Sequence, residues 1–106
     1  MFHSSLLSFF SVKQGTPSDE ELEELGSEIH AERTSWKKLA RRLKIEESKI
    51  NGIDNKDEEL SEKAYQMLLY WKQKHGSDAI YKVLFEALNH KMVNRIDLAK
   101  KYCCES

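Results

Sequence analysis

Apolar residues recur at helical spacing along most of this chain. Trp36, Leu39, Ala40 and Leu43 lie at positions i, i+3, i+4 and i+7, which places their side chains on one face of a helix. Similar stripes occur elsewhere in the 106 residues, and the whole chain contains one proline and four glycines. Because residues that interrupt helices are so rare, we expect an all-α protein.

We expect six short helices, each with one apolar face turned toward a common core. The first spans about 19–31, with acidic residues in its first turn, where carboxylates favour the helix dipole. Gly76 is expected to end the fourth helix in the left-handed conformation. Short loops between short helices favour an antiparallel bundle. The expected helix starts, in chain order, are Ser18, Thr34 or Ser35, the turn at 46–48, the stretch 57–61, Ser77 and Asn94.

Charge alternates in blocks along the chain, although the net charge is only −1. Residues 18–32 hold seven acids and no Lys or Arg, whereas residues 33–44 hold six bases and no acid. Residues 46–62 are acidic again, and residues 63–101 are mainly basic. A folded chain with this pattern has a surface of two signs, which suits a protein partner better than a polyphosphate.

The residue types and spacings needed for catalysis or for binding a metal or cofactor are missing. There is no glycine-rich phosphate loop, and the four histidines lack ligand spacing with the adjacent Cys103 and Cys104. These neighbouring thiols fit a reduced, cytosolic protein. The paired acids at 20–21, 23–24 and 46–47 are expected on solvated faces, where little would shift a pKa. We therefore predict a protein that is not an enzyme, without catalytic residues, cofactor or metal.

The basic stretch of residues 33–44 allows three interpretations. The apolar stripe of the second helix leaves the four bases Lys37, Lys38, Arg41 and Arg42 pointing away from the core. They could form a solvated face, bind nucleic acid or contact an acidic protein surface. Acidic blocks on both sides would repel phosphates, so a protein partner is favoured and nucleic acid is the alternative.

Three ordered segments resemble death domains. The stretch "SWKKLARRLKIEESKINGID" is similar to the second and third helices of that family, "LSEKAYQMLLYWKQKHGSDAIYKVLFEAL" to the fourth and fifth, and "NRIDLAKKY" to the sixth. The resemblance covers about 18–104, and another member of the wider death-fold group is the main rival. It implies a six-helix Greek-key bundle without enzymatic activity. Such a domain is expected to bind other death domains, homotypically or heterotypically, in cytoplasmic signalling of cell death or inflammation. The resemblance also implies that copies can build helical assemblies.

The resemblance also implies a binding surface, because death domains commonly use charged faces of their second and third helices. Residues 18–104 then form the domain, with a flexible extension at 1–17 and a tail at 105–106. The extension lacks the basic start of a signal peptide and is too short to span a membrane, so no membrane insertion is expected. The candidate protein-binding residues are Lys37, Lys38, Arg41, Arg42, Glu46, Glu47, Asp54, Asp57 and Glu58.

Overall fold

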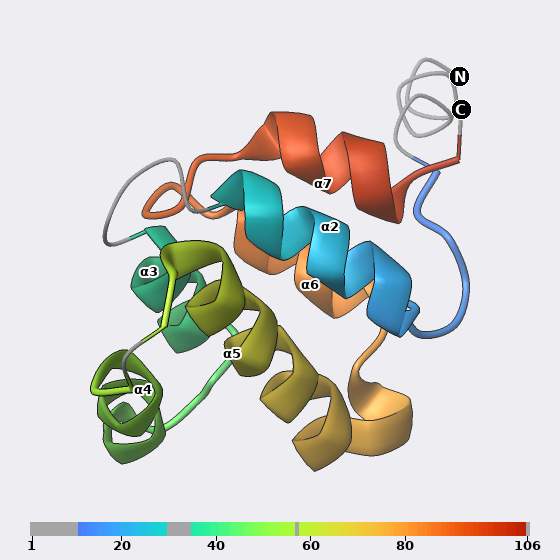
Figure 1. Cartoon of the computed structure of the whole chain (residues 1–106). Helices are drawn as coiled ribbons and strands as arrows, with labels where there is room; N and C mark the ends of the chain where they lie inside the picture. The colour runs from blue at the N-terminus through green and yellow to red at the C-terminus, as the bar shows by residue number, and fades with distance from the viewer. Residues whose placement is uncertain (1–10, 30–34, 57, 106) are drawn as a thin grey trace.

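The computed structural model describes residues 11–29, 35–56 and 58–105. This part of the chain contains six α-helices and no strand, which confirms the all-α, six-helix prediction. Figure 1 shows their arrangement as a bundle. The helices are α2 (Asp19–Ile29), α3 (Ser35–Arg42), α4 (Glu47–Asp54), α5 (Leu60–His75), α6 (Tyr81–Asn89) and α7 (Ile96–Cys103), and a 3-10 turn, η1 (Gly76–Asp78), follows α5.

The longest helix, α5, lies at the centre of the bundle. It packs against α2 on one side and against α3 and α4 on the other, while α6 packs on α7 and α3 (Figure 1). The predicted apolar stripes meet here, because every helix buries residues in one shared core. Among the largest fully buried side chains are Trp36, Trp71, Leu22, Leu25, Leu39, Met67, Leu68 and Leu84.

The start of α2 follows the predicted cap at Ser18 and adds a reciprocal contact. The Ser18 hydroxyl accepts a hydrogen bond from the backbone N–H of Glu21 at 3.1 Å. The Glu21 carboxylate in turn accepts one from the backbone N–H of Ser18 at 3.0 Å. This capping box satisfies two donors that would otherwise be left at the helix end.

Two other predicted caps are wrong, because turns that the periodicity does not reveal precede the helices. Ser77 lies inside η1, and the residue in extended conformation before α6 is Ile80. Arg95 rather than Asn94 is the N-cap of α7, and Asn94 adopts a left-handed conformation with φ 56°. Gly76 does end α5, as predicted, and has a positive φ of 54°, but its ψ of −122° lies outside the expected left-handed helical conformation. Thr34 lies outside the described residues.

Residues 11–17 form an N-terminal strap that binds the far end of the chain. Val12 pairs with Cys104 in an isolated antiparallel bridge, with the Lys13 N–H donating to the Cys103 carbonyl at 2.8 Å. The backbone carbonyl of Gly15 accepts a hydrogen bond from the Tyr81 N–H at 3.0 Å. This part of the expected flexible extension is therefore packed on α6 and α7, a contact between residues far apart in the sequence that no local pattern reveals.

Candidate protein-binding surface

The structure places the candidate binding residues along two neighbouring helices. The four bases lie on α3, whereas Glu46 is the N-cap of α4 and Asp54 is its last residue. Helices α3 and α4 pack against each other, so these bases and acids share one side of the bundle. Glu58 is exposed in the link before α5, and Asp57 lies outside the described residues. We call this set, without Asp57, the α3–α4 surface.

Two bases of the α3–α4 surface pair with acids of the same surface. Lys37 contacts Asp54 at 2.6 Å, and Lys63 of α5 reaches the same carboxyl group at 3.1 Å. Arg41 contacts Glu47 at 2.7 Å. Lys37, and after it Lys63, hold the pKa of Asp54 below its ordinary value. These bases are therefore less available to a partner than the sequence suggests, and Lys37 is half-buried rather than fully turned to solvent.

The remaining two bases of α3 have no carboxylate partner in the described part of the chain. Lys38 is half-buried, and Arg42 is exposed. An Nη1 atom of Arg42 lies 3.2 Å from Nε2 of His90, the residue that ends α6. Pairing at Lys37 and Arg41 therefore leaves Lys38 and Arg42 as the two α3 bases without a carboxylate partner among the described residues.

Glu46 joins α4 to α5 through a lysine and a tyrosine. Lys74 donates to its carboxylate at 2.8 Å, and the Tyr70 hydroxyl donates to it at 3.1 Å. The hydrogen bond from Lys74 is the main reason that the pKa of Glu46 falls to about 2. This candidate binding residue therefore holds two helices together and stays ionised at neutral pH.

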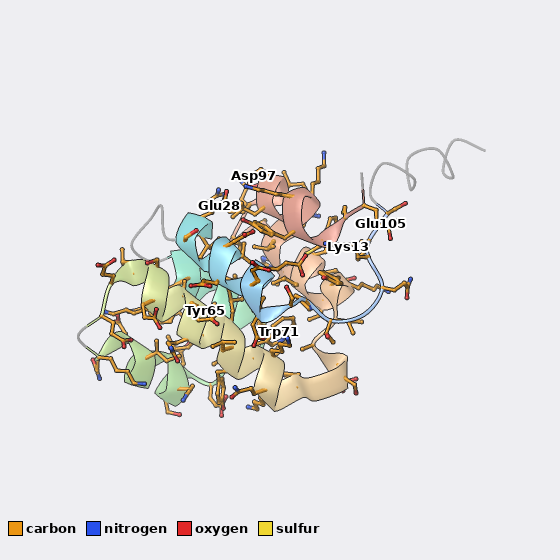
Figure 2. The ribbon with its side chains drawn as sticks, turned by 45° about the vertical axis from the view of Figure 1, so that its right-hand side comes forward. Lys13, Glu28, Tyr65, Trp71, Asp97 and Glu105 are labelled. Carbon is orange, nitrogen blue, oxygen red and sulfur yellow. The ribbon has the colours of Figure 1, made fainter. Side chains whose placement is uncertain are left out.

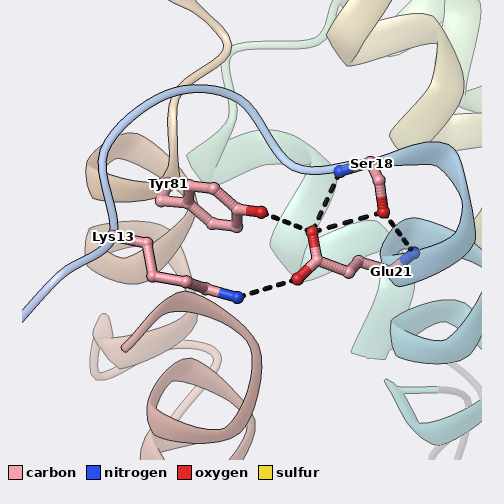
Figure 3. A network of polar contacts seen from close by, with 4 residues as sticks. All are labelled: Lys13, Ser18, Glu21 and Tyr81. Atoms are coloured by element: carbon pink, nitrogen blue, oxygen red, sulfur yellow. Dashed lines mark hydrogen bonds and ion pairs between the residues drawn. The ribbon is translucent and has the colours of Figure 1, made fainter. Parts of the chain in front are cut away.

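A second carboxylate, Glu21, anchors the strap, and sequence reasoning missed its role. Lys13 donates to it at 2.8 Å from the strap, and the Tyr81 hydroxyl donates to it from α6 (Figure 3). Lys13 projects from the strap beside α2 in Figure 2 as well. Partial burial opposes ionisation of Glu21, but the hydrogen bonds from Lys13, Tyr81 and the Ser18 backbone outweigh it and lower the pKa to about 2. The only local signal was the three-residue spacing from Ser18.

The same arrangement occurs on α7, where Lys101 and Tyr102 both donate to Glu28 of α2.

The expectation that the paired acids would have ordinary pKa values was wrong for Glu21, Glu46 and Glu47, and each pKa is lowered. Lysine or arginine side chains from other parts of the fold cause this, and their proximity cannot be read from local sequence. A carboxylate with a lowered pKa holds its charge at neutral pH, which suits an ion pair that supports the fold.

Replacing Glu21 by glutamine is expected to lower the melting temperature near neutral pH, and to do so less in acid. The pKa of Glu21 is about 2 in the fold against an ordinary 4.5. A carboxyl group whose pKa is lowered in the folded state stabilises the protein at pH values above the pKa that it has in the unfolded chain. This contribution is lost as the pH falls from about 4.5 toward about 2. The difference in melting temperature between wild type and Glu21→Gln should therefore shrink across that window.

Thermal unfolding followed by circular dichroism across this range measures the effect. Glu20→Gln is the matched control, since Glu20 is exposed beside Glu21 and forms no ion pair in the described part of the chain. A difference for Glu21→Gln that stays constant with pH would show that the ion pair with Lys13 does not stabilise the fold.

Neither a metal-binding cluster nor a membrane-spanning helix occurs in the described ranges. Among these residues, no three His, Cys, Asp or Glu side chains gather where they could hold a metal ion. None of the described helices combines the length and the apolar character needed to cross a bilayer.

Comparison with known proteins shows which family this fold and its sequence represent. Residues 19–102 match the family model described as Death domain. The chain belongs to the death domain family. The match takes in all of α2 to α6 and most of α7, and it leaves the strap outside.

Two relatives of this death domain come from mammals. Tumor necrosis factor receptor superfamily member 6 of Rattus norvegicus is 31% identical over 101 residues, which cover 84% of this chain and 31% of the rat protein. FAS-associated death domain protein of Mus musculus is 37% identical over 62 residues, which cover 58% of this chain and 30% of the mouse protein. This chain thus spans about a third of each relative's length. No solved structure matches it.

Proposed function

We propose that this death domain is a non-enzymatic interaction module, an adaptor or modulator that binds other death domains in apoptotic or inflammatory signalling. The observation that carries the proposal is the family match across 19–102, together with a six-helix bundle that has charged groups of both signs on α3 and α4. A cytoplasmic location and assembly into larger helical complexes belong to the same proposal.

The α3–α4 surface is the docking face in this proposal. Lys38 and Arg42 supply positive charge without a carboxylate partner in the described ranges, and Glu58 supplies exposed negative charge. The Arg41–Glu47 pair is exposed and can exchange partners with a docked protein, whereas the Lys37–Asp54 pair is half-buried and less available. Exposed ion pairs contribute about 1 kcal/mol or less each, so stable capture requires several contacts at once or multivalent assembly.

The nucleic-acid alternative receives no support from this surface. Two of the four bases on α3 are already neutralised by Asp54 and Glu47. Carboxylates at this position would also face the phosphates of a bound nucleic acid and oppose their approach. We infer that the basic helix serves protein contacts.

Reversing two charges on α3 tests the proposed docking face. Arg41→Glu with Arg42→Glu should abolish capture by a partner death domain, because both changes turn attraction into repulsion toward an acidic surface. The measurement is surface plasmon resonance of the whole chain on the immobilised regions of the rat and mouse relatives that align with it. Wild-type binding should also weaken as salt is raised, since salt screens exposed charges.

Two controls separate the docking face from the fold. Lys82→Glu with Lys91→Glu makes an equal change of charge at two exposed lysines outside α3 and α4, and should leave binding intact. Arg41→Glu with Glu47→Arg exchanges the two charges of one ion pair within the surface and so keeps the pair. A loss of binding by this variant would therefore come from the changed charge pattern and not from the loss of the ion pair. Unchanged capture by the Arg41→Glu, Arg42→Glu variant would refute this docking face.

A further inference from the structure

Two hydrogen-bond donors compete for one histidine ring where α3 meets the end of α6. Nδ1 of His90 accepts a hydrogen bond from the backbone N–H of Met92 at 3.0 Å. Nε2 of the same ring lies 3.2 Å from Nη1 of Arg42, and a guanidinium nitrogen can only donate. A neutral imidazole has a single nitrogen that accepts, and a protonated ring has none. The ring therefore cannot accept from both donors.

The contact with Met92 decides where the unmatched donors point. Because Nδ1 accepts from the backbone, the proton of the neutral ring lies on Nε2. Nε2–H of His90 and the guanidinium of Arg42 are then two donors that face each other. The Arg42 side chain is exposed, so it can turn slightly and share an acceptor with His90. An oxygen atom of an external anion would supply that acceptor.

These two donors line a pocket between α3 and α6, which we call the α3–α6 pocket. Its volume of about 380 Å³ lies within the range of small-molecule sites, roughly 300–1,000 Å³. Lys44 adds a third group that can donate to an anion, and Val83 and Ala87 add apolar surface. The pocket is thus large enough for a small anion with an organic group attached. Its lining consists of Arg42, Lys44, Val83, Glu86, Ala87 and His90.

Lys44 occupies a backbone position that usually belongs to glycine. Its N–H donates to the Arg41 carbonyl at 3.1 Å, and the Ile45 N–H donates to the Ala40 carbonyl at 3.1 Å. These two bonds form the Schellman pattern at the end of a helix. Lys44 has a φ of 67°, in the left-handed region that glycine adopts without strain. Lysine is less stable than glycine in this conformation, but it brings a cationic side chain into the lining of the pocket.

Glu86 is the acid in the lining of the α3–α6 pocket. It is exposed, and no ion pair joins it to Arg42 or Lys44 in the described part of the chain. Two cationic side chains and the His90 N–H therefore oppose one carboxylate, which leaves an excess of positive charge for one anion. A nucleic acid would need a longer row of bases along its phosphates.

We propose that the α3–α6 pocket binds one phosphate group, either as inorganic phosphate or as a phosphate monoester. Its oxygens would accept hydrogen bonds from Nε2–H of His90, the Arg42 guanidinium and the Lys44 ammonium group. A phosphate group carries nearly two negative charges and three acceptor oxygens, so it can meet donors on three sides better than a planar carboxylate can. Val83 and Ala87 would contact the organic part of a monoester.

Nitrogen-15 NMR of the whole chain, titrated with inorganic phosphate at constant ionic strength, tests the proposal. The backbone amide of Met92 and the side-chain N–H groups of Arg42 should shift and reach saturation, and chloride alone should not cause these shifts. Lys44→Gly should weaken the affinity by about tenfold, because one charge-assisted hydrogen bond is lost. The melting temperature of Lys44→Gly should stay the same or rise, since glycine suits the left-handed conformation.

Two control variants separate the pocket from the general charge of the chain. Lys56→Gly makes the same change at an exposed lysine that also follows a helix but does not line the α3–α6 pocket, and it should bind phosphate as wild type does. Glu86→Gln should bind phosphate more tightly, because it removes the negative charge that opposes the anion.

Two further ligands define the chemistry that the pocket takes. Phenyl phosphate that binds more tightly than inorganic phosphate would assign the pocket to monoesters, and equal or weaker binding would assign it to free phosphate. Acetate that binds as tightly as either phosphate would overturn the choice of a phosphate group.

Three other results would contradict the proposal. Shifts at Met92 that do not saturate would exclude a site at His90, and equal affinities of Lys44→Gly and Lys56→Gly would exclude Lys44 as a ligand. Unchanged or weaker binding by Glu86→Gln would place the anion outside the pocket. The titration uses the chain alone, so its result does not depend on whether α3 docks a partner death domain.

Discussion

Replacing Trp36 by alanine is expected to lower the free energy of unfolding by about 3–5 kcal/mol. Trp36 is fully buried in the first turn of α3, and α3 packs against α2, α5 and α6 as well as α4. Loss of the indole would leave a cavity where several helices meet. Natural domains are stable by about 5–15 kcal/mol, so the change removes a large fraction of the total.

Urea unfolding followed by far-ultraviolet circular dichroism measures this loss. Trp36→Phe is the matched control, because it keeps an aromatic ring in the core and loses only the five-membered ring of the indole, so it should leave a smaller cavity and cost less than Trp36→Ala. The Nε1 atom of Trp36 finds no hydrogen-bond partner in the described part of the chain, so its removal should cost little. A loss below about 1 kcal/mol for Trp36→Ala would contradict the packing of α3 described above.

Replacing Gly26 by valine is the second change with a large expected effect. Gly26 is buried in α2, and a Cβ atom there would lie 3.1 Å from the Tyr65 backbone nitrogen and 3.3 Å from the Ser61 carbonyl oxygen of α5. Backbone atoms cannot rotate away as a side chain can, so α2 and α5 would have to move apart. We expect Gly26→Val to lower the free energy of unfolding by about 1–3 kcal/mol or more.

Gly52 of α4 is the matched control for this change. It is also helical, but it is exposed, and a Cβ atom there would meet nothing within 4 Å. Gly52→Ala should therefore raise the free energy of unfolding by up to about 1 kcal/mol through helix propensity. Gly26→Ala should raise the free energy of unfolding by less than Gly52→Ala does, or should lower it, because contact of the new methyl group with α5 opposes the gain in helix propensity. Urea unfolding of the variants would contradict the close approach if Gly26→Ala and Gly52→Ala were equally stabilising.

The charged residues show how far local sequence reasoning reached. Spacing along α3 places Arg41 and Arg42 outside the core, and both are exposed in the structure. It could not show that Arg41 pairs with Glu47 or that Lys37 pairs with Asp54, since these contacts depend on how α3 packs beside α4. It also missed Lys13 and Glu21, which come from the strap and α2 and meet beside Tyr81 of α6.

The sequence alone determined the number of helices, their apolar faces and most of the core. These follow from a period of 3.6 residues and from local turn chemistry, so a short window of sequence contains the whole signal. Ser18 and Gly76 mark helix ends for the same reason. The family follows from the order of these local patterns along the chain.

Only the tertiary structure decided which charges neutralise one another and which remain open to a partner. It also decided that Gly26 lets α2 approach α5 and that the strap pairs with Cys103 and Cys104 at the end of α7. The physical reason is range: hydrophobic periodicity acts between residues three or four apart, whereas these contacts join residues up to 92 positions apart, as in the bridge from Val12 to Cys104. Their partners are set by the packing of whole helices, which no single segment of sequence contains.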